Sequence, residues 1–145
     1  MKAQDLMTKD PETCEASDTL RDVVEIMREE DCGLVPITGG NGEARVIGVV
    51  TDRDVALYLG KEDRKPSDVR AEDVMKSDIV RCDPDTDVSE VTRMMEKAQV
   101  RRILVCDGPR LVGVISTADV ARATGRSEAG RVLEGVSQPG HTQGH

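Results

Sequence analysis

The sequence predicts an α+β protein in which one strand–helix–strand–strand–helix unit occurs twice. The first observation is an apolar run, Val46–Val50, that leads into Thr51–Asp54 and returns in the second half as Leu111–Ile115 before Ser116–Asp119. The second observation is that the residues ahead of both runs also match in constant register. Similarity at so many positions indicates a duplicated structural unit.

The matching positions are an opening Asp-x-Met, a cysteine, the apolar residues of a helix and a middle strand. They pair Asp5-Leu6-Met7 with Asp73-Val74-Met75, Cys14 with Cys82, Leu20 with Val88, Met27 with Met95, and Val35-Pro36-Ile37 with Ile103-Leu104-Val105. The last strand matches after a shift of three residues, because the turn at 38–45 is longer than its counterpart at 106–110. Lengthening a Gly-rich surface turn costs little free energy, so the shift is compatible with duplication.

Local signals give each unit its elements in order. A short strand is expected near Glu12-Thr13 and again near Val80-Arg81. An amphipathic helix follows each, opening after Asp18-Thr19 and Asp85-Thr86, since small polar residues commonly precede a helix. The middle strands are expected at 34–38 and 102–106. Each leads through a turn to the β-branched run that precedes the closing helix, at 52–59 or 117–124.

These elements define the expected domain limits. The first repeat is predicted at residues 4–60 and the second at 72–124. A polar segment at 61–71, which contains Pro66, is predicted to link them. Residues 125–145 are predicted to form a flexible C-terminal tail.

The spacing Ser/Thr-x-x-Asp at the end of each strand has a structural and a functional interpretation. A hydroxyl at the N-cap and a carboxylate at the third helical position form a capping box. The same arrangement places a hydroxyl and a carboxylate beside the free N–H groups of a helix N-terminus, where a phosphate or a ribose can bind. Two copies in matching places, Thr51 with Asp54 and Ser116 with Asp119, leave both interpretations open.

Composition excludes several classes of function. The chain is 33% charged and 37% hydrophobic, which predicts a folded protein. A net charge of −8 argues against binding to a nucleic-acid polymer, which requires a basic surface. Because Tyr58 is the only aromatic residue, a bound base would contact aliphatic side chains and backbone. No apolar run reaches the roughly 20 residues of a membrane span, and the N-terminus does not resemble a signal peptide, so a cytoplasmic protein without membrane contact is expected.

The cysteines give no metal signature. Cys14, Cys32, Cys82 and Cys106 are far apart in the sequence and form no Cys-x-x-Cys pair. Reduced thiols in or near the core are therefore expected, although the equivalent places of Cys14 and Cys82 leave a redox pair or metal clip as an alternative. His141 and His145 lie in the expected tail, where a metal site is not predicted.

Together these residues resemble the cystathionine β-synthase (CBS) domain. The resemblance rests on the Asp-x-Met opening, the helix that ends near a methionine, the apolar middle strand and the closing Gly-x-x-[Thr/Ser]-x-x-Asp, and it covers about residues 4–124. Two such units in tandem resemble a CBS pair, or Bateman module. The resemblance implies two β-α-β-β-α repeats packed sheet to sheet about a pseudo-two-fold axis, with two clefts between them.

The resemblance also implies a function and its residues. CBS pairs often bind adenosine-containing ligands such as AMP, ADP, ATP or S-adenosylmethionine, and thereby regulate a partner protein, here unknown. The residues carried over for ribose and phosphate are Thr51 with Asp54 and Ser116 with Asp119. Arg101 and Arg102 occupy the place of phosphate-binding residues in the second repeat, whereas the first has Gly33 and Leu34, with Arg53 as a substitute. The short first strands would offer backbone amides to the adenine.

Three further expectations concern the two clefts, self-association and enzymatic activity. The Asp119 cleft should bind nucleotide phosphates more tightly than the Asp54 cleft, which is expected to be empty or to prefer a less anionic adenosine. The apolar helix residues, including Val24, Met27, Val91, Met94, Met95 and Ala98, suggest a homodimer. No required cofactor and no enzymatic activity are expected, because no nucleophile–base pair, metal triad or phosphate loop is present. The alternative is a ligand-free dimeric stress-response or interaction module with a cysteine redox or metal role.

Overall fold

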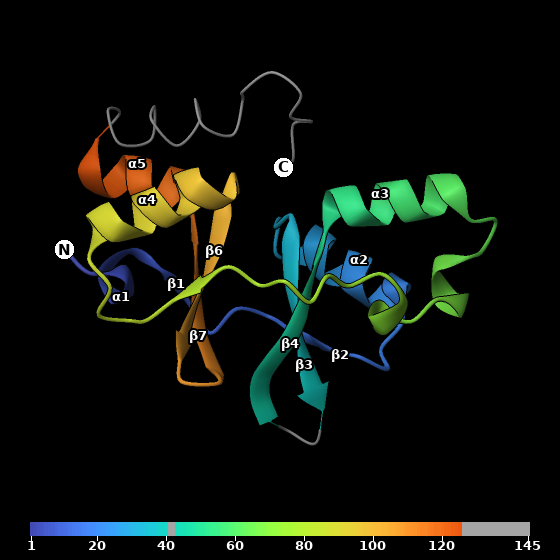
Figure 1. The fold of residues 1–145 in the computed structure, drawn as a ribbon. Coiled ribbons are helices and arrows are strands. Elements are labelled where there is room, and N and C mark those ends of the chain that lie inside the picture. Colours follow the sequence, from blue (N-terminus) through green and yellow to red (C-terminus); the bar gives the residue numbers. More distant parts are fainter. Residues whose placement is uncertain (41–42, 126–145) are drawn as a thin grey trace. The chain divides into compact units, whose positions relative to one another are not determined.

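The structure is a computed structural model that describes residues 1–40 and 43–125 (Figure 1). The chain forms two compact units. The first-repeat unit is Pro11–Ile79, and the second-repeat unit combines Met1–Asp10 with the described residues 80–125. The expected tail at 125–145 lies, apart from Gly125, outside the described residues. The α+β class predicted from the sequence is confirmed.

The first-repeat unit contains a three-stranded sheet with helices. Strand β2 (Cys14–Glu15) pairs in parallel with β3 (Leu34–Gly40), and β3 pairs antiparallel with β4 (Glu43–Thr51). Helix α2 (Leu20–Glu29) connects β2 to β3, and α3 (Asp52–Lys61) directly follows β4. Two short 3₁₀ turns, η1 (Pro66–Asp68) and η2 (Ala71–Asp73), complete the unit.

The second-repeat unit has the same order with one additional strand. Strand β5 (Arg81–Cys82) pairs in parallel with β6 (Arg102–Asp107), which pairs antiparallel with β7 (Arg110–Ser116). Helix α4 (Val88–Ala98) precedes β6, and α5 (Thr117–Thr124) follows β7. The N-terminal segment adds α1 (Ala3–Leu6) and β1 (Thr8–Lys9), which pairs antiparallel with β7.

The opening segments of the two repeats are exchanged. Residues of the N-terminal segment bind the second repeat, since the Ala3 N–H donates to the Thr86 carbonyl at 2.8 Å and the Val88 N–H to the Met1 carbonyl at 3.0 Å. Figure 1 shows this blue segment beside the yellow and orange elements of the same unit. The second Asp-x-Met lies correspondingly in the first-repeat unit, where the Lys76 N–H and the Val49 N–H each donate to the other residue's carbonyl at 2.9 Å.

The segment at 61–71, expected as a linker, contributes to the core of the first-repeat unit. Val69 is fully buried and packs with Leu20 and Val23. Its carbonyl accepts a hydrogen bond from the Leu20 N–H at 2.7 Å, at the start of α2. Ala71 is also fully buried, and its N–H donates to the Asp18 carbonyl at 2.7 Å. This part of the chain is therefore packed as well as connecting.

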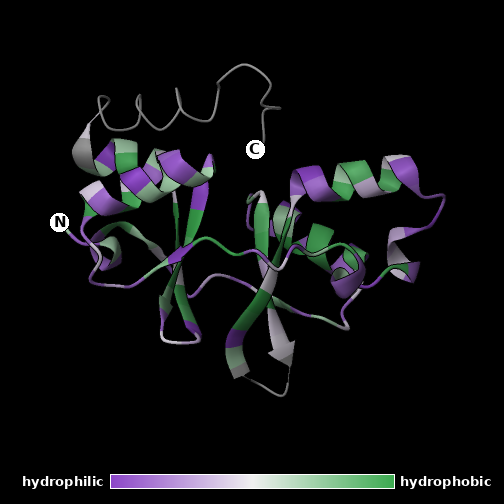
Figure 2. Cartoon of the chain, viewed as in Figure 1, coloured by the Kyte–Doolittle hydropathy of each residue, from purple (hydrophilic) through white to green (hydrophobic). Residues whose placement is uncertain are grey.

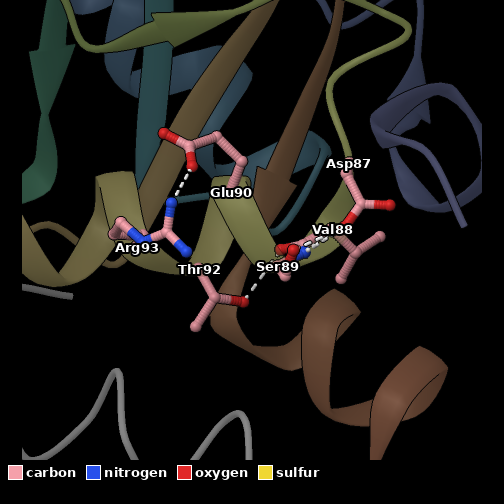
Figure 3. A network of polar contacts seen from close by, with 6 residues as sticks. All are labelled: Asp87, Val88, Ser89, Glu90, Thr92 and Arg93. Carbon is pink, nitrogen blue, oxygen red and sulfur yellow. Dashed lines mark hydrogen bonds and ion pairs between the residues drawn. The ribbon is translucent and has the colours of Figure 1, made fainter.

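The two long helices begin with different caps. At α2, the Thr19 hydroxyl accepts from the Asp22 N–H at 3.2 Å, as its position before Leu20 indicated. Helix α4 begins at Val88, the first apolar residue after Asp85-Thr86, as the sequence predicted, and its N-cap is Asp87 (Figure 3). Asp87 accepts from the backbone and the hydroxyl of Ser89, and these hydrogen bonds lower the pKa of its carboxyl. The Thr86 hydroxyl instead accepts from the Asp83 N–H at 3.0 Å.

Each unit has its own hydrophobic core between its sheet and helices. The strands β4, β6 and β7 are coloured mainly as hydrophobic in Figure 2, whereas the helices alternate between hydrophobic and hydrophilic residues. The fully buried residues come from both kinds of element. In the first-repeat unit they include Leu20, Val23, Val35, Ile37 and Val50, and in the second Val91, Met95, Val105, Ile115 and Val120. Burying one such side chain stabilises a fold by about 1.5–3 kcal/mol.

The glycine of each closing motif is required by a methionine from the exchanged opening segment. A Cβ on Gly113 would lie 2.7 Å from Cγ of Met7, and a Cβ on Gly48 would lie 2.7 Å from Sδ of Met75. At Gly48 the Lys76 carbonyl oxygen would also lie within 2.9 Å. Carbon atoms normally approach only to about 3.5–4.0 Å, so neither position accepts a side chain without movement.

We expect Gly113→Ala to destabilise the protein by about 1–3 kcal/mol, because the new methyl overlaps Met7. Adding Met7→Ala should recover part of this loss, since it removes the Sδ and Cγ atoms of Met7 that lie nearest to the new methyl. Gly48→Ala should recover less on adding Met75→Ala, because the Lys76 carbonyl remains. Urea denaturation of single and double variants gives the coupling energies. Equal coupling energies for the Gly113/Met7 pair and the Gly48/Met75 pair would contradict this account.

Candidate ligand-binding site

The first closing motif forms a complete capping box at the junction of β4 and α3. The Thr51 hydroxyl accepts a hydrogen bond from the Asp54 N–H at 3.1 Å, and Oδ2 of Asp54 accepts from the Thr51 N–H at 2.9 Å. Thr51 has extended backbone geometry, as an N-cap requires. The two side chains thus fix where the strand ends and the helix begins.

The second motif forms the same structure at the junction of β7 and α5. The Ser116 hydroxyl accepts from the Asp119 N–H at 3.2 Å, while Oδ2 of Asp119 accepts from the Ser116 N–H at 2.8 Å. The Ser116 hydroxyl also lies 3.1 Å from Oδ2 of Asp119, at hydrogen-bond distance. Both aspartates are buried, each with 7% of its surface exposed.

The second oxygen of each aspartate faces a cation. Oδ1 of Asp54 lies 3.1 Å from Nζ of Lys76, and Oδ1 of Asp119 forms an ion pair with Arg122. The cations are mainly exposed, with 66% of the Lys76 side chain and 71% of the Arg122 side chain accessible. Each carboxylate therefore uses one oxygen for the cap and the other for an ion pair at the protein surface.

Capping and ligand binding are compatible at these residues. An ionised carboxylate has about four lone-pair positions, and the cap uses only part of this capacity. The cation of each pair is mainly exposed and can turn toward solvent, so a ligand that donates hydrogen bonds to Oδ1 can compete with it. The capping interpretation is thus confirmed in its geometry, while the ligand interpretation stays a prediction.

The structure places Arg101 and Arg102 beside the second motif. Arg102 is the direct strand partner of Ser116, and the Arg101 carbonyl accepts from the Thr117 N–H at 3.0 Å. Residues directly opposite on antiparallel strands have Cβ atoms about 4.5–5.5 Å apart. Both arginines are half-buried. Ser116, Asp119 and the two arginines therefore gather at one end of the β6–β7 pair.

The first-repeat unit has the same geometry without the arginines. Leu34 is the strand partner of Thr51, and the Gly33 carbonyl accepts from the Asp52 N–H at 2.9 Å. Arg53 lies on the first turn of α3, where its N–H donates to Oδ1 of Asp52 at 2.8 Å. The register at both sites is therefore the one expected from the repeats.

Sequence reasoning missed Lys76 and Arg122. Arg122 follows Asp119 by three residues on the same helix, so the helical i, i+3 spacing could have identified this pair. Lys76 lies far from Asp54 in the sequence and reaches it through backbone pairing with Val49. No local spacing signals that contact. The short strands β2 and β5 begin one or two residues after the starts that the sequence indicated.

No disulfide joins the four cysteines, all of which lie in the described part of the chain, and three of them are buried. Burial raises the pKa of the Cys14 thiol to about 12, with further increases from Asp18 and Asp22. Burial also raises the pKa of Cys82 to about 11. Burial raises the pKa of Cys106 as well, although the nearby Arg81 partly opposes this increase. Thiols react and bind metals as thiolates, so these environments disfavour both reactions.

The described residues give no further sign of a metal site or a membrane segment. Within residues 1–40 and 43–125, no group of three or more His, Cys, Asp and Glu side chains is placed to hold a metal ion. His141 and His145 lie outside this part of the chain. None of its helices has the length and apolar character needed to cross a bilayer.

Two β-α-β-β-α units, each closed by a capped Ser/Thr-x-x-Asp turn, define a tandem-repeat α+β module. The family model of the CBS domain matches residues 3–61 and 71–126. The chain therefore belongs to the CBS domain family and contains a CBS pair, a type of regulatory module.

Similar proteins include relatives of nearly the same length. The uncharacterized protein YlbB of Bacillus subtilis (strain 168) is 32% identical over 138 residues, which are 94% of this chain and 92% of YlbB. Hypoxic response protein 1 of Mycobacterium tuberculosis is 32% identical over 120 residues, covering 83% of this chain and 82% of that protein.

Two solved structures share the fold. A crystal structure of Hypoxic Response Protein I with two coordinated zinc ions has a TM-score of 0.75 and 31% identity, covering 84% of this chain and 98% of that chain. The CBS domain pair of protein MJ0100, in complex with 5′-methylthioadenosine and S-adenosyl-L-methionine, also has a TM-score of 0.75. It is 23% identical and covers 86% of this chain and 96% of that chain, which is a likeness of fold.

The thiol environments predict a strong contrast in alkylation. At pH 8 a thiol of pKa about 12 is roughly 1000-fold less ionised than one of pKa 9. Native Cys14 and Cys82 should therefore react with iodoacetamide at least about 100-fold more slowly than in denaturant, whereas the half-buried Cys32 should react first. Peptide mass spectrometry measures each rate. Equal native rates at Cys14 and Cys32 would refute this.

Proposed function

We propose that the chain is a regulatory CBS pair that binds adenosine-containing ligands, of the AMP, ADP, ATP or S-adenosylmethionine class, at its Ser/Thr-x-x-Asp turns and transmits binding to a partner protein. The observation that supports this is the state of Asp54 and Asp119. In both units Oδ2 of a buried aspartate accepts the hydrogen bond of the cap, while Oδ1 forms an ion pair with a mainly exposed cation.

The chemistry of a ribose suits this arrangement. Its vicinal hydroxyls donate two hydrogen bonds, which a fixed carboxylate accepts, and hydrogen bonds to charged groups contribute roughly 1.5–3 kcal/mol each. The adjoining helix N-terminus favours an anion such as a phosphate. A carboxylate that is already ordered loses little conformational entropy on binding.

Phosphate recognition should differ between the two sites. Arg101 and Arg102 lie at the Asp119 site, and the corresponding residues at the Asp54 site are the uncharged Gly33 and Leu34. Because the chain has a net charge of −8, an anionic ligand needs local cations to offset the long-range repulsion. We infer that the Asp119 site is the tighter site for nucleotide phosphates.

Calorimetry on conservative variants tests both sites. Asp119→Asn keeps an oxygen for the cap and removes the charge, so it should abolish the tight AMP site, while Asp54→Asn should leave it intact. The expected difference in AMP affinity between the sites is about ten-fold or more, which corresponds to about 1.4 kcal/mol. Arg102→Ala should weaken AMP far more than adenosine. Loss of the tight site in Asp54→Asn alone would reverse the assignment.

A thermal-shift panel of AMP, ATP, NADH and S-adenosylmethionine identifies the ligand class. A ligand at 100 times its dissociation constant stabilises the fold by about 2.7 kcal/mol, which is readily detected. If none of these compounds shifts the unfolding temperature or gives heat in calorimetry, adenosine binding is rejected.

A second candidate is a stress-response module with a metal role, because Hypoxic Response Protein I, a 31% identical relative, coordinates two zinc ions. The raised pKa values of Cys14 and Cys82 act against this in the present chain. Metal analysis of the full chain, purified without chelator or affinity tag, separates the candidates. Stoichiometric zinc that Cys14→Ser removes would favour the metal role.

We also propose that the chain forms a homodimer through apolar helix side chains that are exposed in its own unit. Val91 and Met95, two of the helix residues considered from sequence, are fully buried in their own unit. Val24 on α2 and Leu57 on α3 are instead 38% and 60% exposed, in the same unit. These exposed side chains, and not the buried methionine, are the candidates for contact with a second copy.

Sedimentation equilibrium at tens of micromolar should show a dimer for the native chain. Val24→Glu places a charge on the exposed apolar surface and should shift the protein toward monomer. Ser17→Glu adds the same charge at an exposed position ahead of α2 and serves as the matched control. A monomeric native protein would refute dimerisation, and a dimeric Val24→Glu variant would exclude this surface.

A further inference from the structure

We propose that Lys76 selects the charge of the ligand at the Asp54 site: it neutralises Asp54 when no ligand is bound and transfers to a ligand phosphate when a ribose occupies Asp54. This inference rests on the proposed function and adds a specificity-determining residue to it. It revises the sequence expectation that this site prefers a less anionic adenosine.

The ion pair joins two groups of very different exposure. Only 5% of the Asp54 side chain is accessible, whereas 66% of the Lys76 side chain is. The 3.1 Å contact involves Oδ1 of Asp54, the oxygen that the cap does not use. A buried carboxylate that is shielded from water needs a compensating partner. The Lys76 ammonium provides this positive charge from the surface side. Any group that displaces the ammonium must itself donate hydrogen bonds to Oδ1.

Lys76 is anchored at its backbone, whereas its side chain is largely exposed. Its N–H donates to the Val49 carbonyl and its carbonyl accepts from the Val49 N–H, both at 2.9 Å. These bonds hold its Cα beside β4, two residues before Thr51. The flexible four-carbon side chain lets the ammonium leave Asp54 and remain near the site. Displacement by a ribose therefore leaves a cation close to the bound ligand.

In the second-repeat unit a different residue provides the cation that pairs with the aspartate. Thr8 pairs with Val114 as Lys76 pairs with Val49, so Thr8 occupies the place of Lys76. There the cation on the aspartate is Arg122, one helical turn beyond Asp119 on α5. The corresponding residue on α3 is Leu57, which carries no charge. The two duplicated sites thus receive their cation from different elements.

The charges decide which ligand Lys76 favours. Adenosine offers hydroxyl donors to Asp54 but carries no anion. Its binding therefore supplies no negative charge for the displaced ammonium. AMP offers the same hydroxyls together with a phosphate, to which the ammonium can donate charge-assisted hydrogen bonds. Lys76 consequently disfavours adenosine relative to AMP. Removing the charge at residue 76 should reduce this discrimination without requiring a change in the fold.

The test is calorimetry with AMP and adenosine on the full chain. All proteins carry Asp119→Asn, which silences the other site. The measured quantity is the ratio of the dissociation constants of adenosine and AMP at the Asp54 site. In Lys76→Met this ratio should fall about ten-fold or more, with AMP bound more weakly and adenosine bound equally or more tightly. Lys76→Arg keeps the positive charge and should keep the ratio within about three-fold.

Two further variants make the result decisive. Lys61→Met removes the same charge at an exposed position at the end of α3 and should leave the ratio unchanged, which controls for net charge. Lys76→Gln keeps a hydrogen-bond donor for Asp54, so it gives the same reading if the Met variant does not fold. An unchanged ratio in a folded Met or Gln variant overturns the role of Lys76.

The outcomes also separate this inference from the proposed function. If AMP binds, Asp54→Asn abolishes the binding in this background and Lys76→Met does not alter the ratio, the ligand site stands and the role of Lys76 falls. If neither AMP nor adenosine binds any form of the protein, both are rejected. If Lys61→Met lowers the ratio as much as Lys76→Met, the effect is one of net charge and the inference falls.

Discussion

The capping box at the end of β4 and of β7 is the interaction on which each unit depends. It joins the last strand to the closing helix through two reciprocal hydrogen bonds, such as those between Thr51 and Asp54. The loss of an N-cap side chain typically costs about 0.5–2 kcal/mol. Because the cap also fixes the orientation of the aspartate, the same bonds that start the helix present the remaining carboxylate oxygen at the surface. Structure and candidate function therefore share these residues.

A second constraint is the close packing of a methionine against a strand glycine. Met7 lies over Gly113 and Met75 over Gly48, so each Asp-x-Met opening packs on the closing strand of the other repeat. Neither repeat, taken as a continuous segment, contains all of its own core. Residues 4–60 alone would lack Val69 and Ala71, which are fully buried in the first-repeat unit. Each unit therefore takes part of its packing from a segment of the other repeat.

The duplicated sites have kept their caps and changed their cations. Both aspartates are equally buried and both use Oδ2 for the cap, yet one faces Lys76 and the other Arg122. Arg101 and Arg102 add further positive charge only at the second site among the described residues. Duplication therefore preserved what folding requires at the strand–helix junction. The surrounding charge, which folding constrains less, is where the two sites differ.

The sequence by itself determined the elements, their duplication and the local turn structure. The apolar runs, the Thr19 cap and the Ser/Thr-x-x-Asp turns involve residues within three or four positions of one another, so their hydrogen bonds follow from local spacing. The resemblance to the CBS domain pointed to Arg101 and Arg102 ahead of the middle strand, and the pairing of β6 with β7 sets Arg102 opposite Ser116. The start of α4 at Val88 also follows from local signals, with Asp87 as its cap, while the Thr86 hydroxyl accepts from the Asp83 N–H in the preceding turn.

Only the tertiary structure decided the contacts between distant segments. The pairing of Lys76 with Val49 brings an ammonium to Asp54, and the packing of Val69 turns an expected linker into part of a core. The periodicity of the sequence does not predict these contacts, because each depends on which strand an extended segment pairs or packs with in the folded chain. The burial that raises the pKa of Cys14 likewise comes from the packed unit. Local hydrogen bonding can thus be read along the chain, whereas burial and the partners of exposed charges arise from the way the chain is packed.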